Sequence, residues 1–179
     1  SVKEFIAFHK HREMKKLKKI ESETIFKNKK ILESNCGAGV LLSILKNKSK
    51  KTAGIDDISY KNYLQKNGHE YFSSIDKIIK NKKKFDIIFS LSELEHKFDP
   101  SLFLNKLKKI LSKNGKLIVR IPNFNNIYKI FLGKRFYRYD FRTSHNFYFS
   151  QKNLKILFNK TSLKIVKEIG FQEYDVNHL

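Results

Sequence analysis

The sequence predicts an α/β fold of the Rossmann-like, doubly wound kind, with a mostly parallel sheet and helices on both faces. Apolar segments of strand length alternate with helical segments from Lys29 onward, and this alternation is typical of a parallel sheet. Segment 85–89 is nearly all apolar, as a strand that is buried on both faces must be. The first strand-like segment, 30–34, also runs directly into a glycine-rich turn.

Local signals place the elements of the first half. Residues 3–20 predict a basic helix with a loose apolar face, which we expect to cover one side of the domain. A lid over a site or a helix on a membrane surface is the alternative for this segment. After the first strand and its turn, apolar residues predict a helix, and a second strand then ends in an acid. The expected elements are strands at 30–34, 52–56 and, more weakly, 69–73, and helices at 40–45 and 59–66, the latter stopped by Asn67-Gly68.

The second half continues the alternation. The Lys/Asn run 80–84 predicts a solvated loop, and Pro100 begins a helix for which Asn114-Gly115 is the expected stop. Segment 123–149 is aromatic and irregular, and Ser150 is a helix cap. We expect strands at 85–90, 116–121 and 163–171, and helices at 100–111 and 150–159.

Length and composition bound the possibilities. The 179 residues fit one domain, which we divide into an N-terminal helix (1–28) and a ligand-binding domain (29–179) with 123–149 on the substrate side. The single cysteine excludes a disulfide scaffold or a multi-cysteine metal site, and favours a cytoplasmic setting. No run of about 18 apolar residues is present, so no membrane span is expected. No starting Met is present either, so we expect a trimmed chain or a fragment.

The charge is strongly positive, with 38 Lys+Arg against 17 Asp+Glu and a formal net charge of +21. Such a charge favours anionic ligands. Only five of the 38 are arginine, however, and specific readers of nucleic acid prefer the bidentate arginine fork. Nucleic-acid binding is therefore not expected as the main role. No metal is expected, because His9, His11, His69 and His178 have no metal-like spacing.

The glycine-rich turn and the acid after the second strand indicate the ligand. Small residues at Gly37, Ala38 and Gly39 let a ligand approach the backbone at a helix N-terminus. Asp56 stands where an acid commonly binds two ribose hydroxyls. Together they predict an adenosine-containing ligand. The third glycine of a dinucleotide fingerprint is absent, which disfavours NAD or FAD, and no P-loop is present.

Five segments, in this order and spacing, resemble the motifs of class I S-adenosylmethionine-dependent methyltransferases. The resemblance covers about 29–171 and is strongest to the quinone-biosynthesis O-methyltransferases and the methyltransferases of surface-sugar pathways. The segments are Ile-Leu-Glu-Ser-Asn-Cys-Gly-Ala-Gly at 31–39, Gly-Ile-Asp at 54–56, Phe-Asp-Ile-Ile at 85–88 with Leu-Glu-His-Lys-Phe-Asp-Pro at 94–100, the run 107–123, and Ser-His-Asn-Phe-Tyr-Phe-Ser at 144–150.

The resemblance implies the cofactor S-adenosylmethionine, with S-adenosylhomocysteine as product, and a role for each matched position. Two positions depart from the family. Asn35 replaces the first glycine of the family's glycine-rich motif, and Ser74 replaces an acid that binds the edge of the adenine. Asparagine tolerates left-handed backbone angles, so the turn can form. The implied cofactor-binding residues are Glu33, Asn35, Cys36, Gly37, Ala38 and Gly39 at the methionine end, Asp56 at the ribose, Asp57, Ile58, Ser74 and Ile75 at the adenine, and Ser90 and Leu91 under the cofactor.

The resemblance places His96 near the transferable methyl group, and His145 is the second candidate for a base, because a neutral imidazole suits proton removal at pH 7. Either can instead be a structural residue at an element boundary. After the fifth strand, arginines among aromatics are expected to hold an anionic acceptor; the alternative is an aromatic loop that packs on the sheet and leaves its arginines in solvent. These substrate candidates are Arg135, Arg138, Tyr139 and Arg142.

The sequence therefore predicts an enzyme that methylates an oxygen of a small sugar-like or anionic metabolite. A binding or scaffold protein on a decayed methyltransferase fold is one alternative, favoured by Asn35 and Ser74. An RNA methyltransferase is the other, favoured by the charge but disfavoured by Ser-Leu-Ser-Glu at 90–93, where an Asn-Pro-Pro motif would stand. Eight residues follow Phe171, so the fold lacks the family's last antiparallel strand or the chain is cut before it.

Overall fold

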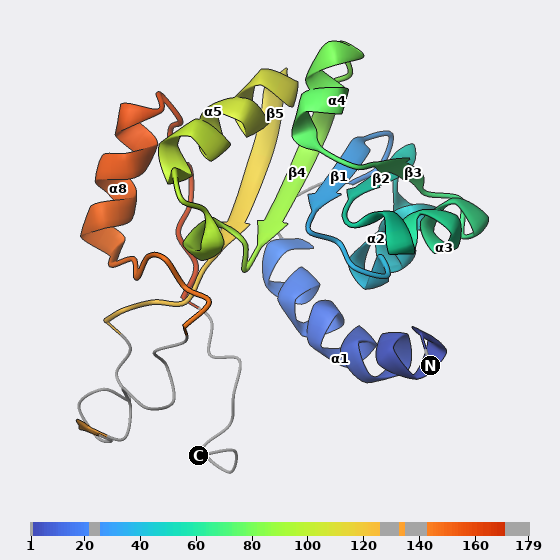
Figure 1. Cartoon of the computed structure of the whole chain (residues 1–179), viewed down its shortest axis with the longest axis horizontal. Coiled ribbons are helices and arrows are strands. Elements are labelled where there is room, and N and C mark those ends of the chain that lie inside the picture. Colours follow the sequence, from blue (N-terminus) through green and yellow to red (C-terminus); the bar gives the residue numbers. More distant parts are fainter. Residues whose placement is uncertain (1, 22–25, 126–132, 135–142, 171–179) are drawn as a thin grey trace. The chain divides into compact units, whose positions relative to one another are not determined.

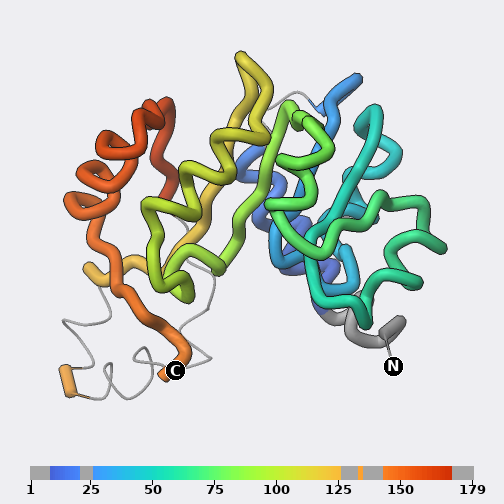
Figure 2. Tube along the Cα trace, turned by 45° about the horizontal axis from the view of Figure 1, so that its top comes forward, coloured from blue at the N-terminus to red at the C-terminus, as the bar shows by residue number. Residues whose placement is uncertain are grey.

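The computed structural model describes residues 2–21, 26–125, 133–134 and 143–170. The chain forms two compact units, residues 1–73 with 165–179 and residues 74–164. Figure 2 traces the strand–helix alternation along the chain in both units.

The first unit contains three parallel strands, in the order β3-β2-β1. They are β1 (Lys30–Ser34), β2 (Lys51–Ile55) and β3 (Glu70–Phe72). The strands β1 and β2 are buried along four of their five residues, because parallel strands are covered on both faces. The linking helices are α2 (Val40–Leu45), with the 3₁₀ turn η1 (Lys46–Lys48), and α3 (Lys61–Lys66), preceded by η2 (Ile58–Tyr60).

The predicted basic helix is confirmed as α1 (Val2–Glu21). Leu17 on this helix is buried, whereas most of its lysines are exposed, and α1 contacts α2 in the same unit (Figure 1). Burial of Leu17 helps to explain why a helix so rich in lysine packs against its neighbour. The division of the chain at residue 28 stays a prediction.

The second unit contains two parallel strands, β4 (Phe85–Leu91) and β5 (Leu111–Arg120). Its helices are α4 (Ile75–Lys80), α5 (Pro100–Ile110) and α8 (Gln151–Lys160), and η3 (Leu94–His96) follows β4. Helix α5 contacts both α4 and α8 and buries Phe103, Leu104 and Leu107 (Figure 1). Asp99 caps it, with the Leu102 amide donating to Oδ1 across 2.8 Å, and Ser150 caps α8 as expected.

Three expectations about elements were wrong. Helix α4 was not predicted, because it has only six residues and buries only one of them, Ile78, which gives too weak a helical pattern. Strand β5 starts at Leu111 rather than at residue 116, so Asn114-Gly115 lies within the strand instead of ending the helix. The pairing of β5 with β4 shifts register between Phe85 and Ile87, which accommodates these residues. The segment 163–170 contains no strand. Its alternating apolar residues are exposed at Val166 and Ile169, so they do not face a core.

The predicted fold class is confirmed. The described residues contain five strands, the pairings β1–β2, β2–β3 and β4–β5 are parallel, and helices connect the strands. This is the Rossmann-like α/β arrangement expected of a class I methyltransferase.

Candidate functional site

The turn after β1 has the backbone geometry that its glycines predict. Three of its residues adopt left-handed angles: Asn35 with φ 57°, Gly37 with φ 52° and Gly39 with φ 69°. Asparagine is one of the few side-chain-bearing residues that adopts this region readily, so the replacement of a glycine at 35 leaves the turn intact. The Gly39 amide donates to the Cys36 carbonyl across 2.9 Å, and the Ser43 amide then donates to Gly39 as α2 begins.

Asp56 joins this turn to the end of β2. Its Oδ2 accepts a hydrogen bond from the Gly37 amide across 2.6 Å, and its Oδ1 accepts from the Asp57 amide across 2.8 Å. The Tyr71 hydroxyl donates to the Asp56 carbonyl across 3.0 Å. A carboxylate has about four acceptor sites, so Asp56 can still accept from two ribose hydroxyls. Sequence analysis identified both residues but not the bond between them.

The surroundings of this link fit an adenosine group. A Cβ at Gly37 would meet no heavy atom within 4 Å, so open space lies beside its backbone. Ile58 is 63% exposed although it is apolar, and it follows directly after the two acids. The amide of Ser59 donates to Oδ1 of Asp57 across 2.9 Å, and this bond lowers the pKa of the Asp57 carboxyl. An exposed apolar side chain beside the predicted ribose-binding acid is a surface that could hold an adenine ring.

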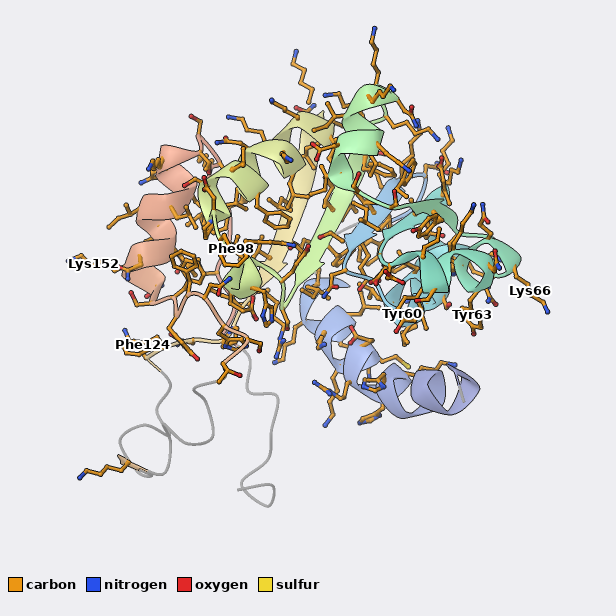
Figure 3. All side chains as sticks on the ribbon, viewed as in Figure 1. Tyr60, Tyr63, Lys66, Phe98, Phe124 and Lys152 are labelled. Carbon is orange, nitrogen blue, oxygen red and sulfur yellow. The ribbon has the colours of Figure 1, made fainter. Side chains whose placement is uncertain are left out.

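Packing beneath the turn depends on a contact that sequence analysis did not predict. A Cβ at Gly54 would lie 2.4 Å from the Cys36 sulfur, so β2 requires a glycine at this position. Cys36 is buried with Leu42 and Leu64, so its side chain packs in this part of the core. Tyr60 packs against this cluster; it and Tyr63 mark the η2–α3 segment in Figure 3.

His69 is a structural residue of the first unit. It is 3% exposed, its Nδ1 lies 2.7 Å from Thr52 Oγ1, and its Nε2 lies 3.3 Å from Ser43 Oγ. Burial, together with the positive charge of Lys46, lowers the pKa of His69 to about 4. The imidazole is therefore neutral at pH 7 and links three elements of the core.

The two predicted catalytic histidines lie together in the second unit. The His96 and His145 rings have centroids 4.8 Å apart in an edge-to-face arrangement. Four hydrogen bonds hold η3 against segment 144–147. The amides of Asn146 and Phe147 donate to the Glu95 carbonyl across 2.9 Å and 3.1 Å, the Asn146 side-chain amide donates to the His96 carbonyl, and His96 Nδ1 lies 2.6 Å from the Ser144 carbonyl.

Glu95 is the residue of this cluster whose burial the sequence did not predict. It is 1% exposed, and neither carboxylate oxygen has a hydrogen-bond partner among the residues that the structure describes. Burial raises the pKa of its carboxyl, an effect that the nearby charge of Glu93 strengthens and those of His96 and Arg120 oppose.

The neighbouring polar residues are paired. Ser90 is fully buried at the end of β4, and its hydroxyl donates to Glu93 Oε2 across 3.0 Å. The other oxygen of Glu93 lies 2.7 Å from Lys97 Nζ. Arg120, at the end of β5, donates to the Ser92 hydroxyl. These contacts fix the loop that carries Glu95 and His96.

The remaining predicted residues have the following positions. Glu33 is buried at the end of β1, Ala38 is buried in the turn, and Leu91 is half-buried at the end of β4. Ser74 caps α4, with its hydroxyl accepting from the Lys77 amide across 3.3 Å, and Ile75 begins that helix. The substrate candidates Arg135, Arg138, Tyr139 and Arg142 lie outside the described residues. The roles of all these residues stay predictions.

Comparison with known proteins identifies the family. The model for the methyltransferase domain matches residues 6–168, which is most of the chain. The chain belongs to the methyltransferase domain family. Its fold and family are those of the class I S-adenosylmethionine-dependent methyltransferases, as the motifs predicted.

Two curated relatives are ubiquinone biosynthesis O-methyltransferases. The protein from Pelagibacter ubique is 30% identical over 126 residues, which cover 66% of this chain and 52% of the relative. The protein from Bartonella tribocorum is 26% identical over 167 residues, which cover 85% and 67%. The chain thus spans about half of the length of the Pelagibacter relative.

A solved structure shows the same fold. The S-adenosylmethionine-dependent methyltransferase of Thermotoga maritima, described as a possible histamine N-methyltransferase, superimposes with a TM-score of 0.64 at 20% identity. The match covers 89% of this chain and 76% of the other. Within the part of this methyltransferase that the structure describes, no helix is long and apolar enough to cross a membrane.

Proposed function

We propose that this methyltransferase transfers a methyl group from S-adenosylmethionine to an oxygen of a small-molecule acceptor. When bound, S-adenosylmethionine supplies a methyl group that its sulfonium has already activated, so the protein has mainly to bind and orient. The observation that carries the proposal is the bond between Gly37 and Asp56, which holds a glycine-lined turn beside a ribose-type acid.

The first unit supplies the residues that would hold the cofactor. Asp56 retains acceptor sites for the ribose hydroxyls, and the exposed side chain of Ile58 offers an apolar face to the adenine. The open space at Gly37 permits close approach to the backbone. Glu33 is placed at the methionine end on the strength of the family resemblance.

The second unit supplies the groups that would handle the acceptor's proton. His96 Nδ1 faces a carbonyl, which only accepts hydrogen bonds, so this nitrogen carries the proton of the neutral ring. Nε2 is then the basic nitrogen that can take a proton from an acceptor hydroxyl. His145 is held beside it at 4.8 Å and is the second candidate.

Two acceptor classes merit testing. Hydroxyls of anionic or sugar-like metabolites fit the charge of +21. A hydroxyl of an intermediate in ubiquinone biosynthesis is the second candidate, favoured by the names of the two relatives. Both are oxygen acceptors, and both require a base or an acidified hydroxyl.

Calorimetric titration with S-adenosylmethionine tests the cofactor, and transfer of a radiolabelled methyl group tests the acceptor. The acceptor panel contains 3,4-dihydroxybenzoate, UDP-glucose and a short RNA oligonucleotide. We expect one cofactor per chain and labelling of a small molecule. Absence of heat at millimolar cofactor would contradict the proposal and favour a scaffold, whereas labelling of the RNA alone would favour a nucleic-acid enzyme.

A further inference from the structure

Strand β3 ends before the chain of β2 reaches Asp56, so the ladder between the two strands supports only part of this residue. The register pairs Tyr71 with Gly54 and Phe72 with Ile55, and β3 has no residue opposite Asp56. The Asp56 amide donates to the Phe72 carbonyl across 3.4 Å. In a longer parallel ladder the Asp56 carbonyl would accept from the next amide of the neighbouring strand. Because β3 stops at Phe72, that carbonyl needs another donor.

The side chain of Tyr71 supplies this donor. Its hydroxyl donates to the Asp56 carbonyl across 3.0 Å. Its ring packs against the buried cluster of Cys36, Leu42 and Leu64, which lies beneath the glycine turn. Packing of the ring limits its rotation, so the hydroxyl is held at the end of β2 whether or not a ligand is present.

The charges around Tyr71 keep its hydroxyl protonated. Partial burial raises the pKa of the hydroxyl, and the carboxylates of Asp57 and Asp56 raise it further, because a phenolate would place a third negative charge beside them. The phenol therefore remains a hydrogen-bond donor at neutral pH. The same effect shows that the Tyr71 hydroxyl lies close to both acids after β2.

Three hydrogen bonds thus hold Asp56 at three different atoms. Phe72 holds its amide, Tyr71 holds its carbonyl, and the Gly37 amide holds its carboxylate oxygen Oδ2. We propose that Tyr71 is a positioning residue of the cofactor site and that it acts through Asp56 on the ribose hydroxyls of S-adenosylmethionine. This inference rests on the proposed function, which assigns the ribose to Asp56.

The physical reason is the geometry that two ribose hydroxyls require. A carboxylate accepts from both only when each O···O distance is about 2.5–3.0 Å, so a small rotation of the Asp56 backbone weakens at least one of the two bonds. Fixing the carbonyl of Asp56 removes that freedom before the cofactor arrives, and preorganisation of this kind raises affinity. If Tyr71 only held β3 against β2, its loss would change stability and would not depend on the hydroxyls of the ligand.

Tyr71→Phe tests the inference, because it keeps the ring and its packing and removes only the hydroxyl. The whole chain is titrated by calorimetry with S-adenosylhomocysteine and, in competition with it, with the 2′-deoxy and 3′-deoxy forms of the same compound. We expect Tyr71→Phe to bind S-adenosylhomocysteine about three- to tenfold more weakly than the unaltered chain, as for the loss of one neutral hydrogen bond. For at least one deoxy form the difference should shrink to within about twofold, because the contact that Tyr71 supports is then absent from the ligand.

Tyr60→Phe is the matched control. The Tyr60 ring packs against the same buried cluster, and its hydroxyl makes no hydrogen bond with the residues that the structure describes (Figure 3). This variant should bind all three compounds within about twofold of the unaltered chain. Urea unfolding of both variants verifies that each is folded at the temperature of the titrations.

Two results would overturn the inference alone. One is unchanged binding of S-adenosylhomocysteine by Tyr71→Phe, and the other is an equal loss of affinity for all three compounds, which would indicate a general structural effect. Absence of binding by the unaltered chain would instead contradict the proposed function, and the inference with it. The titration of the unaltered chain therefore distinguishes the two failures.

Discussion

The amide of Gly37 donates a hydrogen bond to Oδ2 of Asp56 across 2.6 Å and thereby joins the turn after β1 to the end of β2. The two residues are 19 positions apart, and each was identified by its own motif. Because the same carboxylate positions the turn and is expected to bind the ribose, its alteration should affect cofactor binding more than folding.

Asp56→Asn should weaken S-adenosylmethionine binding about 10- to 100-fold. The amide replaces one oxygen, so one of the two backbone N–H bonds and part of the ribose contact are lost; a hydrogen bond to a charged group contributes about 1.5–3 kcal/mol. Calorimetry measures the loss. Glu70→Gln makes the same chemical change on β3, where Glu70 pairs with Lys51, and should leave the affinity unchanged. Equal effects of the two variants would show that Asp56 has no special role.

Gly37→Ala should abolish tight cofactor binding while lowering stability only modestly. Its φ of 52° costs an alanine about 1–2 kcal/mol, and the new methyl group would fill the open space beside the backbone. Gly133→Ala is the matched control, because Gly133 also has a positive φ, 47°, and open space around its Cβ position. Both variants should lose similar stability in urea unfolding, and only Gly37→Ala should lose cofactor affinity. A tight-binding Gly37→Ala variant would place the cofactor elsewhere.

Gly54→Ala should destabilise the first unit by about 1–3 kcal/mol, because its Cβ would lie 2.4 Å from the Cys36 sulfur. Cys36→Ala removes that atom, so the double variant should recover part of the loss. Urea unfolding of both single variants and the double variant gives the coupling free energy. Purely additive effects would mean that another contact, such as Leu42 at 3.1 Å, limits the position.

His69 should make the chain sensitive to acid. Its pKa is about 4 in the folded protein and about 6.5 when unfolded, so below pH 6.5 the unfolded state binds a proton that the folded state does not. Stability should therefore fall as the pH drops from 6.5 to 4, by at most about 1.4 kcal/mol per pH unit from this group. His69→Gln should flatten that slope in pH-dependent urea unfolding. His11→Gln, at an exposed position of α1, should not; an unchanged slope in His69→Gln would show that other groups dominate.

The sequence by itself determined the fold class, and it identified the glycine turn and Asp56, which the structure brings together. The strands before the glycine turn and before Asp56 are short apolar segments that are bounded by turn residues. Local backbone chemistry therefore suffices to place them. Asn35 illustrates this point: its tolerance of left-handed angles predicted an intact turn, and the structure has φ 57° there. The apolar alternation at 163–170 misled, because periodicity does not say whether a face meets a core.

Only the tertiary structure decided what Gly54, His69 and Glu95 do. Gly54 is required by a sulfur 18 positions earlier in the chain, and His69 by hydroxyls on α2 and β2. His145 lies 49 residues beyond His96, so no spacing rule could pair them. Long-range packing sets these contacts, because burial and hydrogen bonding depend on which segments meet in space and not on their separation along the chain.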